Sequence, residues 1–89
     1  MQTINILIKG KVQGVYFRQS AKQKADELGI TGEVRNLANG DVSIQATATE
    51  TQLQQLIDWC QVGPSRAVVT SVETQTINPV SFTGFSVKR

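Results

Sequence analysis

Residues 10–18 read GKVQGVYFR, and in this stretch the sequence pattern changes from strand-like to helix-like. Before it, isoleucines at positions 4, 6 and 8 follow the two-residue period of a β-strand. After it, apolar residues recur at spacings of four, four and three, which is typical of an amphipathic helix: Phe17, Ala21, Ala25 and Leu28. The stretch therefore predicts a tight connection from a strand into a helix, and Gly10 and Gly14 give its backbone the freedom to turn.

The next elements are predicted from turn and pairing signals. Gly29 is suited to end the first helix as a left-handed cap. Residues 31–37 and 41–48 are strand-like, and Asn39-Gly40 between them supplies the positive φ of a tight hairpin. These signals predict two adjacent antiparallel strands.

A second helix follows the hairpin. Thr49 and Gln52 have the spacing of a capping box, and Gly63-Pro64 ends the helical pattern. The apolar residues between these signals lie on one helical face: Leu53, Leu56, Ile57 and Cys60. Residues 67–76 then read as a strand, and residues 82–88 as a short final one that Gly84 weakens.

The predicted order is βαββαβ plus a short terminal strand. This order indicates an α+β, ferredoxin-like split βαβ sandwich, with an antiparallel sheet and two helices on one face. We expect a single domain over residues 1–89. The fold alone names no function, because unrelated enzymes and binding modules share it.

The composition excludes several kinds of chemistry. The chain has no histidine, so Ser-His-Asp and Cys-His nucleophile systems and the usual zinc sites are excluded. Cys60 is the only cysteine, so no internal disulfide is possible. No apolar run is long enough to span a membrane and the first residues do not form a signal peptide, so we expect a cytoplasmic protein.

The glycine-containing loop is a candidate anion site. A loop that leads into a helix N-terminus can direct several backbone N–H groups at one phosphate or carboxylate. Arg18 adds a planar guanidinium group that matches phosphate oxygens. The stretch matches neither GxxxxGK[S/T] nor GxGxxG, so a nucleotide P-loop is not expected. The alternative is an ordinary tight turn with a solvated arginine. The same choice holds for the basic residues of the first half of the chain, which either favour an anionic ligand or form a solvated face: Lys9, Lys11, Arg18, Lys22, Lys24 and Arg35.

GKVQGVYFR resembles the first signature of the acylphosphatases, an apolar residue followed by x-G-x-V-Q-G-V-x-F-R, at every specified position. Residues 32–48, GEVRNLANGDVSIQATA, are similar to the second signature of that family. Two residues depart from the family pattern: Glu33 occupies a position that is usually aromatic, and Ala48 replaces a glycine. We expect these departures to affect local packing and strand twist more than activity.

The resemblance implies a hydrolase that cleaves acyl phosphates to a carboxylate and inorganic phosphate without metal or cofactor. It implies that Arg18 holds the phosphate and that Asn36 binds and orients the attacking water. The backbone N–H groups implied to assist come from the loop: Gly14, Val15, Tyr16, Phe17 and Arg18. The implied partner is a small acyl phosphate, with no nucleic acid or membrane, and nothing requires more than a monomer.

Two other functions remain to be compared. RNA-recognition domains share the element order, but they stack bases on aromatic residues of the central strands, and the strands at 4–8 and 41–48 have none. A non-catalytic domain that binds carbamoyl phosphate would keep the loop, although such domains normally belong to longer chains. The remaining residues have simpler interpretations: Phe17 and Cys60 are expected in the core, Gln13 shapes the loop, and Arg35 either faces solvent or adds charge near Asn36.

Overall fold

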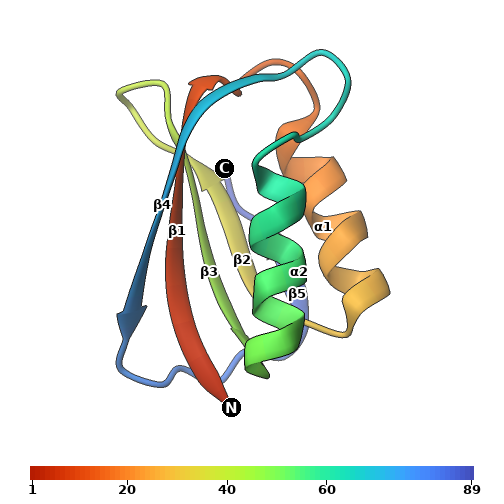
Figure 1. Ribbon diagram of the computed structural model, residues 1–89, viewed down its shortest axis with the longest axis vertical. Coiled ribbons are helices and arrows are strands. Elements are labelled where there is room, and N and C mark those ends of the chain that lie inside the picture. Colours follow the sequence, from red (N-terminus) through yellow and green to blue (C-terminus); the bar gives the residue numbers. More distant parts are fainter.

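The computed structural model describes residues 1–89 and contains a five-stranded sheet with two helices on one face (Figure 1). The elements follow the predicted order, with strand ends that differ from the prediction by a few residues. In chain order they are β1 (Gln2–Lys11), α1 (Phe17–Leu28), β2 (Thr31–Asn36), β3 (Val42–Ala48), α2 (Glu50–Cys60), β4 (Val68–Ile77) and β5 (Phe85–Val87).

The strands lie in the order β4-β1-β3-β2-β5, and all neighbours are antiparallel except the last pair. β5 runs parallel to β2, with Gly32 opposite Phe85 and Val34 opposite Val87. The prediction of an antiparallel sheet is therefore corrected at this edge. The chain crosses from β4 at one edge to the other edge before it forms β5, so the last strand starts from the same end of the sheet as β2 (Figure 1).

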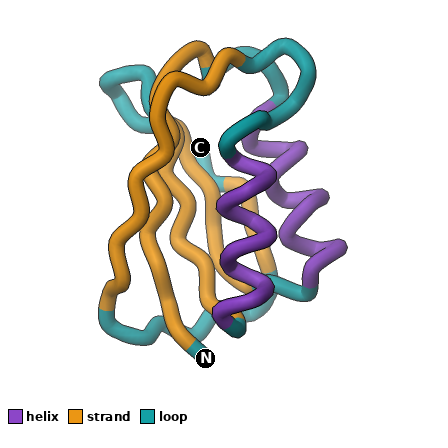
Figure 2. The backbone as a smooth tube through the Cα atoms, in the orientation of Figure 1, coloured by secondary structure: helices purple, strands orange, loops and turns teal.

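The sheet and the two helices form two layers (Figure 2), and the buried core residues come from both of them. β3 shows how a strand contributes to this core: its residues alternate between buried and half-buried along the whole strand, so one of its faces is buried. The helices contribute their predicted apolar faces, namely Phe17, Ala21 and Ala25 from α1 and Leu53, Leu56 and Cys60 from α2. The predicted core positions of Phe17 and Cys60 are confirmed, with exposed fractions of 1% and 0%.

The sequence signals predicted for the start of α2 and for the end of α1 are confirmed. At the start of α2, Gln52 N–H donates to the Thr49 hydroxyl at 3.3 Å, and Thr49 N–H donates to Gln52 Oε1 at 2.9 Å. This is the reciprocal pairing of a capping box. At the end of α1, Gly29 takes the left-handed conformation with a φ of 73°.

Four segments that are far apart in the sequence meet at one end of the sheet. The β1–α1 loop, the β2–β3 hairpin, the α2–β4 loop and the C-terminus all lie at the upper end of Figure 1. At this end Gly10 has a φ of 124° and marks a shift in the pairing of β1 with β4, so β1 bends before it enters the loop. Neither helix has the length and apolar character that a membrane span requires.

Candidate active site

A cavity of about 690 Å³ lies at the end of the sheet where these segments meet. Its lining comes from the β1–α1 loop and the start of α1, the end of β2, the α2–β4 loop and the C-terminal segment. The lining residues are Val12, Gly14, Tyr16, Phe17, Arg18, Gln19, Asn36, Arg66, Val87 and Arg89. The fold therefore brings Arg18 and Asn36, the two predicted catalytic side chains, to one cavity.

The loop that leads into α1 turns through two left-handed residues. Gly14 has a φ of 71° and Tyr16 a φ of 63°, and Tyr16 is the only non-glycine residue of the chain with a positive φ. Such a conformation costs on the order of 1 kcal/mol or more for a residue with a side chain, and it is found mostly where function constrains the backbone. The predicted tight turn is therefore present, and it holds strained backbone.

The same turn leaves a run of backbone N–H groups unpaired. The first helical hydrogen bond is donated by Ser20 N–H to the Tyr16 carbonyl at 3.0 Å, so the amides of residues 17–19 precede the helical ladder. The amides of residues 14–16 also have no backbone acceptor. Unpaired amides at a helix start carry partial positive charge and favour an anion.

Two residues at the junction of the loop and α1 are buried in the core. Phe17 is buried, and its ring lies against Trp59 of α2 with centroids 5.3 Å apart. Val15 is also buried, and it does not line the cavity. These anchors hold the start of α1, and with it the neighbouring Arg18, against the rest of the molecule.

Arg18 is half-buried and is oriented by the C-terminal segment. Its Nη1 donates a hydrogen bond to the Lys88 carbonyl at 2.9 Å. Lys88 N–H in turn donates to the Val34 carbonyl at 2.8 Å, which continues the β2–β5 pairing. A guanidinium group has five N–H donors, so most of them remain available to a ligand in the cavity.

Asn36 is the last residue of β2, which ends one residue earlier than predicted, and it lies opposite Val42 of β3. Its Oδ1 atom is buried and has no hydrogen-bond partner in the protein. A buried acceptor without a partner is uncommon because it loses its bonds to water and gains none in return. A water or ligand donor in the cavity would satisfy it.

The cavity holds more positive charge than the sequence predicted. Arg66 and Arg89 line it together with Arg18, and none of the three forms an ion pair with a carboxylate. Sequence reasoning missed Arg66 and Arg89, because only the folded positions of the α2–β4 loop and the C-terminal segment bring them to the site.

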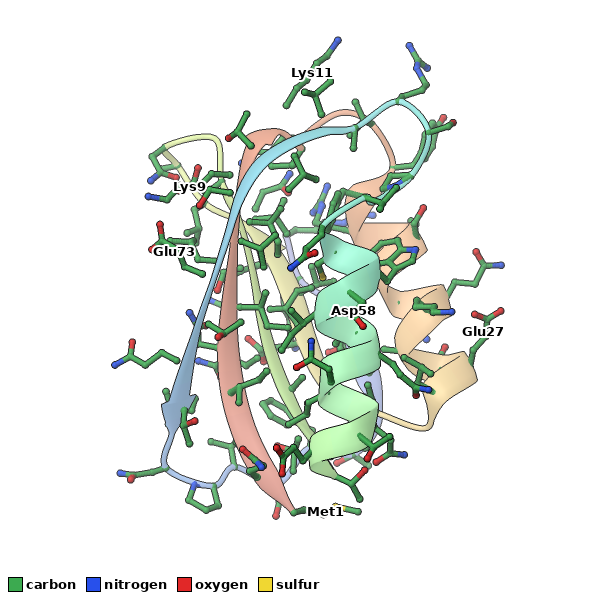
Figure 3. The ribbon with its side chains drawn as sticks, viewed as in Figure 1. Met1, Lys9, Lys11, Glu27, Asp58 and Glu73 are labelled. Carbon is green, nitrogen blue, oxygen red and sulfur yellow. The ribbon has the colours of Figure 1, made fainter.

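Most of the other basic residues that the sequence singled out are paired elsewhere. Lys9 binds Glu73 at 3.3 Å on neighbouring strands, and both lie on the side of the sheet away from the helices (Figure 3). Lys22 and Lys24 pair with acidic residues of their own helix. Arg35 pairs with Glu33, and neither residue lines the cavity. The six basic residues therefore do not form one common face, and only Arg18 among them lines the cavity.

The two departures from the signatures lie away from the cavity. Glu33 lies opposite Gln45 and is occupied by its ion pair with Arg35. Ala48 is buried at the end of β3 opposite Gln2, whereas Asn36 pairs with the first residue of that strand. Both positions fit the expectation that these departures concern packing more than chemistry.

The arrangement suits recognition of a small tetrahedral anion. It combines unpaired backbone amides, an oriented guanidinium group and additional cationic side chains around one cavity, and a neutral amide lines the same cavity. No group of three or more His, Cys, Asp or Glu side chains gathers anywhere in the structure.

Comparison with known proteins agrees with this geometry. The sequence model of the acylphosphatase family matches residues 4–87. An acylphosphatase from Marinobacter nauticus is 54% identical over 78 residues, which are 84% of this chain and 85% of that protein. One from Methylococcus capsulatus is 41% identical over 100% of this chain and 98% of its own length. The crystal structure of acylphosphatase from Bacillus subtilis superposes with a TM-score of 0.96 at 29% identity, with both chains fully covered. The chain therefore belongs to the acylphosphatase family, whose members hydrolyse acyl phosphates.

Proposed function

We propose that the protein hydrolyses acyl phosphates by holding the phosphate group with Arg18 and the loop amides while Asn36 orients the attacking water. The observation that carries this division of roles is the lining of one cavity by Arg18, by the loop with its unpaired amides and by Asn36 with its unpartnered Oδ1. The substrate is a small molecule, and the products are a carboxylate and inorganic phosphate.

The reaction begins with the phosphate group in the loop. The N–H groups of residues 14–18 and the guanidinium of Arg18 donate to the phosphate oxygens and stabilise the charge on them as the bond to the acyl oxygen lengthens. The site is built for this charge before the substrate arrives, because the loop is fixed by the buried Val15 and Phe17. Preorganised donors of this kind are typically worth about 10²–10³ in rate each.

Water completes the reaction from the side of Asn36. The amide oxygen accepts a hydrogen bond from the water, whose oxygen then attacks phosphorus while the acyl oxygen–phosphorus bond breaks. The carboxylate leaves with the electron pair of that bond. Asn36 cannot take a proton, so the proton of the water passes to an oxygen of the phosphate group. An acyl phosphate has a good leaving group, so correct positioning of the water is sufficient and the reaction needs no strong base.

We infer that the catalytic unit is a monomer and that it acts in the cytoplasm. Arg18, Asn36 and the loop that leads into α1 line one cavity within a single chain, which supports a monomeric catalytic unit. The single cysteine is a buried free thiol, which fits a reducing compartment.

Hydrolysis of benzoyl phosphate in the presence of EDTA tests the proposal. The wild-type protein should consume the substrate, and Arg18→Ala should lose both turnover and the binding of inorganic phosphate. A folded wild-type protein that binds phosphate without turnover would instead support a non-catalytic phosphate-binding module. Turnover by Arg18→Ala at the wild-type rate would contradict the role of the arginine.

A further inference from the structure

Gln13 joins the β1–α1 loop, here called the phosphate loop because it is proposed to hold the phosphate, to the β2–β3 hairpin. Its Nε2 atom donates one hydrogen bond to the Leu37 carbonyl at 2.8 Å and a second to the Asp41 carbonyl at 2.9 Å. Both protons of one amide group are therefore used, and both bonds cross more than twenty residues of sequence. They are the only hydrogen bonds between the loop and this hairpin.

The two carbonyls lie directly beside the residues that place Asn36. Leu37 follows Asn36 in the chain, and Asp41 precedes Val42, the β3 residue opposite Asn36. On its other side, Gln13 directly precedes Gly14, the first of the residues whose amides are proposed to hold the phosphate. One side chain thus contacts both parts of the site, the loop that receives the phosphate and the strand end that carries Asn36.

We propose that Gln13 is a positioning residue that fixes the distance and orientation of Asn36 relative to the phosphate loop. This inference rests on the proposed roles of Arg18 and Asn36. In-line attack needs the water and the phosphorus atom to be placed within fractions of an ångström, and a misplacement of about 1 Å can cost about 10²-fold in rate. A tether between the two parts of the site supplies that placement.

The chemistry of the tether explains why the residue is glutamine. The site needs two donors on one atom, without a charge that would alter the field around the phosphate. A glutamate of the same length has no donors when ionised, and its oxygens would face the two carbonyls. A methionine has nearly the same length and no donor. Asparagine is shorter by one methylene group and would not reach both acceptors.

The hairpin does not depend on Gln13 for its own hydrogen bonds. Leu37 N–H donates to the Asp41 carbonyl at 2.8 Å, and Gly40 N–H donates to the Leu37 carbonyl at 3.1 Å. Each carbonyl therefore keeps a backbone donor when the glutamine is replaced. The expected consequence is a folded protein in which the hairpin and the loop are no longer held together.

Kinetics of Gln13→Met and Gln13→Glu test the proposal with benzoyl phosphate as substrate and inorganic phosphate as competitive inhibitor. We expect kcat to fall about 10- to 100-fold in Gln13→Met, and at least as far in Gln13→Glu. The inhibition constant of phosphate should change less than about threefold in Gln13→Met, because Arg18 and the loop remain. In an Asn36→Ala background, Gln13→Met should have no further effect on kcat, since the two residues act as a unit.

Thr3→Val provides the matched control. Its hydroxyl group is fully buried at the opposite end of the sheet and is hydrogen-bonded to the Thr47 hydroxyl at 2.7 Å and to Val80 N–H at 3.0 Å. This variant loses tertiary hydrogen bonds as the Gln13 variants do, and it should retain the wild-type kcat. All variants are assayed at a temperature below their thermal unfolding transitions, which are measured by circular dichroism.

The outcomes separate this inference from the proposed function. If Gln13→Met keeps a kcat within twofold of wild type while Asn36→Ala is inactive, the positioning role is wrong and the role of Asn36 stands. The positioning role would also be overturned if Gln13→Met lowered kcat equally in the wild-type and Asn36→Ala backgrounds. A rise in the phosphate inhibition constant that matches the loss in kcat would overturn it as well. If Asn36→Ala hydrolyses at the wild-type rate, the role of Asn36 itself is wrong.

Discussion

The guanidinium group of Arg18 and the carbonyl group of Lys88 are joined by a hydrogen bond of 2.9 Å across seventy residues of sequence. Lys88 is itself held to β2 by the bond from its N–H to the Val34 carbonyl. The C-terminal segment therefore orients the arginine beside the strand that carries Asn36. This relationship gives the last residues of the chain a part in the site.

Removal of residues 88 and 89 should weaken phosphate binding. Without the Lys88 carbonyl, Arg18 loses the partner that fixes its orientation, and a single hydrogen bond to a charged group is worth roughly 1.5–3 kcal/mol. We expect the inhibition constant of inorganic phosphate to rise about tenfold or more. The control is Arg89→Gln, which removes the charge of the last residue and keeps the Lys88 carbonyl. Equal inhibition constants for the truncated chain and for Arg89→Gln would contradict the orienting role.

The three cavity arginines should attract substrate over a distance. Arg66 and Arg89 have no carboxylate partner, so Arg66→Gln and Arg89→Gln each remove a free positive charge from the cavity wall. We expect kcat/KM to fall a few-fold at low ionic strength and the difference from wild type to shrink near 0.5 M salt, because salt screens exposed charges.

Lys9→Gln is the matched control for these charge changes. It removes one positive charge from the opposite side of the sheet, where Lys9 pairs with Glu73 (Figure 3). Its kcat/KM should stay close to wild type at every salt concentration. A loss equal to that of Arg66→Gln would show that net charge matters and that the position of the arginine does not.

The sequence predicted the parts of the site that depend on local patterns. Arg18 follows a glycine-containing turn at a helix start, so the residue pattern alone marks it as a candidate for anion binding. Asn36 was identified only by the resemblance to the acylphosphatase signatures. Both residues line the cavity. Arg66, Arg89 and the bonds of Gln13 depend on which loops meet in three dimensions. The parallel pairing of β5 was missed for the same reason, because a three-residue strand has no pattern that states its neighbour.

Cys60 should make the stability of the protein depend on pH in the alkaline range. Burial raises the pKa of its thiol from 9.0 to about 12. Between these values the folded chain keeps the proton and the unfolded chain loses it. The free energy of unfolding should therefore fall as the pH rises from about 9 toward 12, by up to roughly 1.4 kcal/mol per pH unit, and this contribution should be constant below pH 9.

Urea denaturation of the wild type and of Cys60→Ala at several pH values between 7 and 10.5 measures this effect. Cys60→Ala is less stable at neutral pH because it loses buried volume, but it lacks the thiol. The difference in unfolding free energy between the two proteins should narrow above pH 9. A difference that stays constant up to pH 10.5 would contradict the raised pKa.

The most direct test of the central claim is to measure turnover and phosphate binding separately in Asn36→Ala. If Asn36 orients water and Arg18 with the loop amides holds the phosphate, kcat for benzoyl phosphate should fall about 10²- to 10³-fold. The affinity for inorganic phosphate, measured by isothermal titration calorimetry, should stay within about threefold of wild type. Hydrolysis by Asn36→Ala at the wild-type rate, or loss of phosphate binding in parallel with turnover, would contradict this division of roles.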